Sequence, residues 1–253
     1  MANQNPKRES LLFNIGFNLV APILILRKGD DWFGPPLAEA LKTTEDSALV
    51  GSIILVVAIA FPVIYGILDL RRRKRWNMIS ILGAVSALLT GGIGLIPGAT
   101  ASMFAVKEAA LPAILAIATI VTLKTEKPLV KLFLYNPDFL NVSRIESALD
   151  LRNSREAFDL LLKRCTWYIA VSFILSAGLN YILARMIVVT EPYQDKKAFN
   201  EEVGAMMGWS FPVISIPCMI VTFFAFWQLM KGIKAHAGLE LEEVLLAPEK
   251  KDA

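Results

Sequence analysis

Hydrophobic residues in this chain are gathered into long blocks, and short polar segments separate the blocks. Six blocks stand out, and five of them have about the twenty residues that a helix needs to cross a ~30 Å hydrocarbon layer. The pattern therefore predicts an all-α fold, a polytopic membrane helix bundle within one integral membrane domain, 1–253. The six predicted spans are 11–26, 48–70, 77–96, 103–123, 166–189 and 207–230.

The first block is the shortest, and it contains Asn14, Asn18 and Pro22. Lys7 and Arg8 precede it, as basic residues precede the apolar core of a signal peptide. No small-residue cleavage site follows, so we expect a retained first span. After it, the stretch PPLAEALK predicts a brief surface helix beginning beyond Pro35 and Pro36.

The distribution of basic residues predicts the orientation of the spans. Of the 26 lysine and arginine residues, nineteen lie in inner segments if both chain ends face the cytoplasm. Six lie in outer segments, and the remaining one is Lys107. Because cytoplasmic loops are enriched in Lys and Arg, we predict an N-in, C-in topology with a long cytoplasmic loop, 124–164, and a cytoplasmic tail, 231–253.

The composition agrees with a membrane protein and restricts the chemistry. Hydrophobic residues make up 55% of the chain and charged residues 19%, against roughly 25% charged in soluble domains. The net charge of +3 is small and its basic residues lie in loops, so we expect no nucleic-acid partner. His236 is the only histidine, and Cys165 and Cys218 are the only cysteines, which disfavours His-based catalysis, a metal centre and a disulfide framework. We expect no cofactor and no enzymatic activity.

The long inner segment contains its own helix signals. Ser143 and Glu146, in the stretch SRIE, have the spacing of a capping box. Downstream, one helical face is predicted to carry the residues Ala157, Leu160, Leu161 and Arg164. We expect a short amphipathic helix at the membrane surface, then a fifth span that begins as an amphipathic extension in the cytoplasm.

Lys107 and Glu108 are adjacent charges inside the fourth predicted span. Neighbouring residues on a helix point about 100° apart, so we expect them not to pair. Lys107 is expected to extend to the outer interface, and Glu108 to face polar groups in the bundle. The predicted buried polar site consists of Asn14, Asn18, Lys107, Glu108, Asn180 and Arg185. Two interpretations stay open: a structural contact between helices, or an ion or solute pathway.

A dense basic cluster follows the second predicted span. It consists of Arg71, Arg72, Arg73, Lys74 and Arg75. Its place fits the orientation rule, and it would also attract anionic lipid headgroups at ~1 kcal/mol per charge. We treat it as a candidate headgroup contact.

Three stretches carry a family resemblance: FPVIYGILDLRRRKRWNMISILGAVSALLTGGIGLI at 61–96, FAVKEAALP at 104–112 and TEKPLVKLFLYN at 125–136. In this order they resemble a family of bacterial integral membrane proteins that is distantly similar to intracellular septation protein A. Trp167, Phe173 and the run 178–180 look like the fifth-span pattern of the septation proteins. The resemblance implies an inner-membrane location and a connection to envelope maintenance or division.

Three functional classes follow from these observations. The first is a non-enzymatic scaffold that organises the envelope and contacts the lipid bilayer and other membrane or division proteins. The second is a small proton- or ion-coupled secondary transporter with the Lys107/Glu108 site at its centre. The third, an enzyme acting on lipid, has the least support. Self-association into a homo-oligomer is left open.

Overall fold

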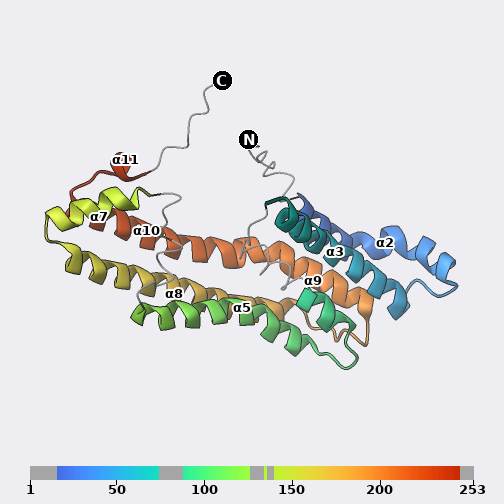
Figure 1. Ribbon diagram of the computed structural model, residues 1–253. Helices are drawn as coiled ribbons and strands as arrows, with labels where there is room; N and C mark the ends of the chain where they lie inside the picture. The colour runs from blue at the N-terminus through green and yellow to red at the C-terminus, as the bar shows by residue number, and fades with distance from the viewer. Residues whose placement is uncertain (1–15, 74–87, 126–133, 136–139, 246–253) are drawn as a thin grey trace, which may run out of the picture. The chain divides into compact units, whose positions relative to one another are not determined.

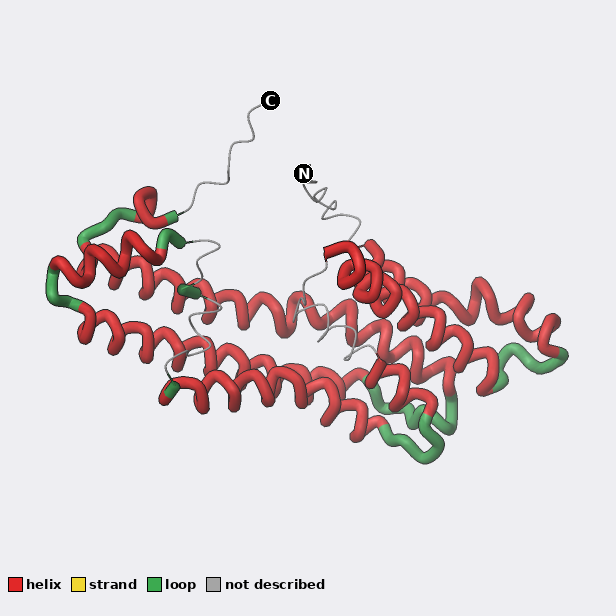
Figure 2. Tube along the Cα trace, in the orientation of Figure 1, coloured by secondary structure: helices red, strands yellow, loops and turns green. Residues whose placement is uncertain are grey.

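The computed structural model describes residues 16–73, 88–125, 134–135 and 140–245. These residues are helical apart from turns and one isolated β-bridge, Leu140 to Leu245 (Figures 1 and 2). Four helical runs in this described part are long and apolar enough to cross a membrane. They are Ala48–Leu68, Ala101–Val121, Arg155–Ile187 and Lys196–Ala237.

These four runs correspond to predicted spans two, four, five and six. The fifth begins at Arg155, eleven residues before the predicted span, so the amphipathic extension is confirmed. The last run contains α9 (Lys196–Ser210), the π-helical turn η3 (Phe211–Ser215) and α10 (Ile216–Ala237). At 1.5 Å per residue its 42 residues measure about 63 Å, so it is much longer than the hydrocarbon layer is thick. Of the third predicted span, only its last part is described, and 88–95 is helical.

The chain divides into two compact units, and each is described by itself. Unit 1 comprises Met1–Ala109 and Leu179–Val213, and unit 2 comprises Ala110–Gly178 and Ile214–Ala253. Three helical runs contribute residues to both units: α5 (Ala101–Val121), α8 (Arg155–Ile187) and the run α9–η3–α10.

Unit 1 is built around α2 (Ala21–Leu41), which follows the π-helical turn η1 (Gly16–Val20) and packs against α3 (Ala48–Arg73) and α9. Glycines allow these helices to approach closely. A Cβ at Gly29 would lie 2.8 Å from the Ile54 side chain of α3. A Cβ at Gly204 of α9 would lie 2.9 Å from the Cβ of Leu26. Both distances are shorter than a carbon–carbon contact, so only glycine fits without a shift.

The helix that contains the predicted end of the first span does not stop at Leu26, because α2 continues to Leu41. The helix passes through Pro35 and Pro36, where we expected a new surface helix to begin. A residue before proline normally avoids helical geometry since its Cβ meets the proline ring, but Gly34 has no Cβ. The helix ends at Lys42, whose φ of 54° is left-handed. The part of this span before Gly16 lies outside the described residues.

Unit 2 packs the predicted cytoplasmic loop against the predicted cytoplasmic tail. Its elements include α7 (Val142–Leu151), the first part of α8, α10 and the short α11 (Leu241–Val244). The buried core includes Ile145, Leu149, Phe158, Leu229 and Ile233. The expected amphipathic helix in the loop is thus present as α7.

Two details of that segment correct the sequence prediction. The cap of α7 is Asn141, whose side chain accepts from the N–H of Arg144, and Ser143 lies within the first turn of the helix. The buried face of α8 carries Phe158, Leu162 and Cys165. On the predicted face, by contrast, Leu161 alone is partly buried, while Ala157, Leu160 and Arg164 are exposed. The prediction placed the buried face wrongly because the large side chain of Phe158, and not the smaller apolar side chains beside it, is buried.

Candidate functional site

Lys107 and Glu108 of α5 form an ion pair with each other, contrary to the sequence prediction. The side chains are 8% and 21% exposed, so Lys107 does not extend into open solvent. Its Nζ also donates to the Thr90 hydroxyl and lies 5.3 Å from the centroid of the Phe104 ring. The long lysine side chain spans the 100° between adjacent helix positions because a buried charge without a counter-charge is costly.

The structure does not join Arg185 to Glu108. The guanidinium of Arg185 donates to the Ser102 hydroxyl at 2.6 Å, near the start of α5. Asn18 in η1 and Asn180 in α8 are half-buried members of the same unit. Asn14 lies outside the described residues, as do Lys74 and Arg75 of the basic cluster. Arg71, Arg72 and Arg73 are the last residues of α3.

A buried charge that the sequence reasoning missed lies in α2. Asp30 is 7% exposed, and neither of its carboxylate oxygens has a hydrogen-bond partner among the residues that the structure describes. Burial raises the pKa of Asp30, the nearby Lys197 ammonium lowers it, and the carboxylates of Glu201, Asp31 and Asp195 raise it further. Lys197 lies 3.7 Å from an oxygen of Asp31, so its ammonium is shared with that neighbour.

Asn200 of α9 is the second buried polar residue of this region. Its side chain is fully buried, and its Nδ2 donates to the Gly51 carbonyl of α3 at 2.8 Å. Its Oδ1 is buried without a hydrogen-bond donor. A polar side chain in a packed interface normally finds all of its partners, so this oxygen and those of Asp30 are exceptions.

Two carboxylates, in and next to the segment between α8 and α9, accept hydrogen bonds from backbone N–H groups. Glu202 accepts from the N–H groups of Val189 and Thr190 at 3.0 and 2.9 Å, and from the Thr190 hydroxyl at 2.8 Å. Glu191 accepts from the N–H of Ala101 at 2.8 Å, where α5 begins. A carboxylate at a helix N-terminus is favoured by the free N–H groups there. Both residues therefore have a structural part in unit 1.

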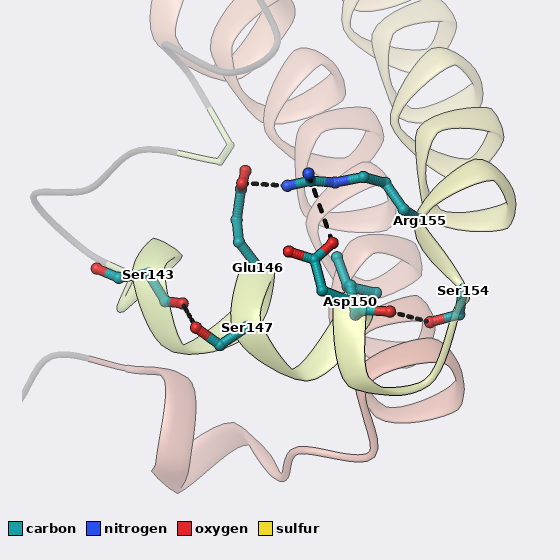
Figure 3. Close-up of polar contacts among 7 residues, drawn as sticks. Ser143, Glu146, Ser147, Asp150, Ser154 and Arg155 are labelled. Carbon is teal, nitrogen blue, oxygen red and sulfur yellow. Dashed lines mark hydrogen bonds and ion pairs between the residues drawn. The ribbon is translucent and has the colours of Figure 1, made fainter.

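In unit 2, charged side chains hold the corner between α7 and α8 (Figure 3). Arg155 pairs with Glu146 and lies 3.5 Å from Asp150, and Ser154 bonds back to the Leu149 carbonyl. Glu146, which we had expected in a capping box with Ser143, is used in this ion pair. Nearby, the hydroxyl of Tyr135 is buried without a partner, and burial raises its pKa well above the usual value.

Hydrogen bonds also connect α8 with α10 in unit 2. The Ser172 hydroxyl donates to the Cys218 carbonyl at 3.1 Å and lies 3.3 Å from the Thr222 hydroxyl. The Cys218 thiol contacts the Ser172 carbonyl at 3.5 Å. Small polar side chains commonly join membrane helices in this way. Both cysteines are free thiols.

Among the described residues, no three His, Cys, Asp or Glu side chains come together as metal ligands. Comparisons of the chain with family models, with curated proteins and with solved structures find no match.

Proposed function

We propose that this chain is a multi-pass protein of the bacterial inner membrane that acts as a non-enzymatic scaffold in envelope organisation or septation. The observation that carries the proposal is the closed ion pair of Lys107 and Glu108. Each charge has its counter-charge within α5, and Thr90 and Phe104 complete the surroundings of the ammonium. The pair brings the two opposite charges together, and its bond to Thr90 connects α5 with the helical segment 88–95.

Exposed apolar side chains support the membrane assignment. Val106, Ile114 and Ile117 of α5 are well exposed, as are Ile220 and Phe223 of α10. Apolar surface on this scale needs a cover, and lipid chains supply one. Trp167, Trp209 and Trp227 are also exposed, and each lies within three residues of a predicted span end. Tryptophan is enriched at that depth.

Packing within the units supports the predicted grouping of segments into two sides. Segments assigned to the cytoplasm, the loop 124–164 and the tail 231–253, meet in the core of unit 2. Segments assigned to the outer side meet in unit 1, where Glu191 binds the N-terminus of α5 and Lys196 bonds to the Gly94 carbonyl. An even number of spans, six in the prediction, brings both chain ends to one side.

The envelope role rests on the resemblance to the septation protein A relatives, and its expected partners are other membrane or division proteins. Affinity purification of the full chain from mildly solubilised membranes tests this role. The proposal expects a stoichiometric complex with such proteins that persists on gel filtration. A chain that elutes alone after in-cell crosslinking would contradict it.

The second candidate is a small proton- or ion-coupled secondary transporter, favoured by the presence of two charges inside an apolar helix. Sealed proteoliposomes with a pH gradient separate the two functions. A scaffold leaves the decay of the gradient at the rate of empty vesicles, for the wild type and for Glu108→Gln. A faster decay that Glu108→Gln abolishes, with the variant still monodisperse, would establish the transporter instead.

A further inference from the structure

Asp30 lies in the contact between α2 and α9, and two contacts fix the register of these helices. Leu26 of α2 meets Gly204 of α9, and Asp31 of α2 lies 3.7 Å from Lys197 of α9. From the first contact to the second, residue numbers rise along α2 and fall along α9, so the two helices are antiparallel. Asp30 lies beside the second contact, where the α9 charges that act on it are Lys197 and Glu201, and Asn200 belongs to the same turn of α9.

In the described part of the chain, three buried oxygen atoms of this region have no hydrogen-bond donor: both carboxylate oxygens of Asp30 and Oδ1 of Asn200. The bond from Asn200 Nδ2 to the Gly51 carbonyl fixes the amide, so Oδ1 is available as an acceptor. An ionised carboxylate buried without a donor is strongly disfavoured. The region therefore needs a positive charge close to Asp30.

The neighbouring side chains do not supply that charge in full. α2 contributes Asp31 and two cations: Lys28, which pairs with Asp31 at 3.3 Å, and Arg27, whose side chain lies against Gly204 of α9. The turn before α9 contributes Asp195, and α9 contributes Glu201 and Lys197. Lys197 is shared with Asp31. Lys196, the next cation on α9, bonds to the Gly94 carbonyl. From α3, the residues that meet α2 and α9 at this level are uncharged, namely Gly51 and Ile54.

We propose that Asp30 and Asn200 form a buried binding site for one monovalent cation, either a proton or an alkali metal ion. Carboxylate and amide oxygens are the ligands that hard cations prefer. A single carboxylate balances a single positive charge. With a proton, Asp30 becomes a hydroxyl donor for an acceptor such as Asn200 Oδ1. The site goes beyond the proposed scaffold role, because a scaffold and a transporter could each contain it.

Thermal unfolding of the full chain in detergent tests the site. The wild type is compared in sodium chloride and in a large organic-cation chloride at equal ionic strength, at neutral and at mildly acidic pH. A bound cation stabilises the folded state by mass action. With Na⁺, the expected rise in Tm is about 3–6 °C for each tenfold increase above its dissociation constant. A rise on acidification alone identifies the proton as the occupant.

Asp30→Asn is the diagnostic variant, and Glu39→Gln is its matched control because Glu39 is exposed on the same helix and is not among the charges that act on Asp30. The proposal expects Asp30→Asn to lose the Tm response to Na⁺ and to acid, and Glu39→Gln to keep it. Asn200→Ala, which removes one ligand, is expected to weaken the response to Na⁺ and serves as the test if Asp30→Asn does not fold. A wild type that responds to neither cation, or an equal response in wild type, Asp30→Asn and Asn200→Ala, would overturn the proposal.

Discussion

Neutralising Glu108 in α5 is expected to destabilise the protein, and the cost follows from the surroundings of Lys107. Breaking a fully buried ion pair costs ~3–5 kcal/mol because one charge loses its partner. Here the Lys107 ammonium keeps the Thr90 hydroxyl and the Phe104 ring, and Glu108 is 21% exposed. Both facts reduce the loss, so we expect about 2 kcal/mol for Glu108→Gln.

The complementary change, Lys107→Met, leaves the Glu108 carboxylate without its cation and is expected to cost about 2 kcal/mol as well. The double variant carries no charge and fills a similar volume, so it should lie within about 1 kcal/mol of the wild type. The cycle then gives a coupling energy of about 3–5 kcal/mol.

The assay is reversible unfolding of the full chain in mixed micelles, measured by tryptophan fluorescence for all four proteins. Lys28→Met is a suitable control, because the Lys28–Asp31 pair is exposed and its loss is expected to cost less than 1 kcal/mol. Additive costs for the two single variants, or a Glu108→Gln protein as stable as the wild type, would refute the reasoning that the buried pair is a coupled structural unit.

Three further predictions concern helix contacts and pH. Gly204→Ala should destabilise unit 1 by about 1–3 kcal/mol, because its Cβ would meet Leu26, whereas Gly208→Ala, with open space around it, should be neutral or stabilising in the same unfolding assay. Glu202→Ala should lower Tm by several degrees because three hydrogen bonds at the end of α8 are lost, and Glu202→Gln should recover part of the loss. The pKa of Tyr135 is raised in the folded state, so its contribution to stability is present below pH ~10 and is lost as pH rises further. Tyr135→Phe should therefore abolish that part of the loss of stability at alkaline pH. At neutral pH the variant should be at least as stable as the wild type, because the buried hydroxyl that has no partner among the described residues is removed.

The apolar blocks were predictable from the sequence because membrane spanning imposes a length and a composition on each helix. Spans two, four, five and six appear as helices that contain or nearly match the predicted ranges. Lengths beyond the bilayer were harder to predict, since α2 and α9 continue as helices through polar residues. Gly34 and Pro35 are residues that normally interrupt a helix, yet α2 continues through them because its buried face packs against other helices.

The sequence identified which charges lie in a span, but it could not identify their partners. Adjacent positions on a helix suggested that Lys107 and Glu108 would separate, yet burial favours bending of the long side chain toward its neighbour. Asp30 lay outside the predicted spans, in the polar stretch RKGDD, and was not among the predicted site residues. The available signal was the four-residue spacing of Leu26, Asp30, Gly34 and Ala38, which places the aspartate on the buried face of one helix.

Two acidic groups of unit 1, Glu108 and Asp30, therefore differ in their surroundings. Glu108 is 21% exposed and shares an ion pair with Lys107. Asp30 has no hydrogen-bond donor among the described residues, and Lys197, the cation that acts on it, also lies 3.7 Å from Asp31. On our proposal, a carboxylate of this kind couples the α2–α9 contact to the cations in the surrounding solution. We therefore expect the response of the folded state to cation concentration to depend on Asp30 and to be lost in Asp30→Asn.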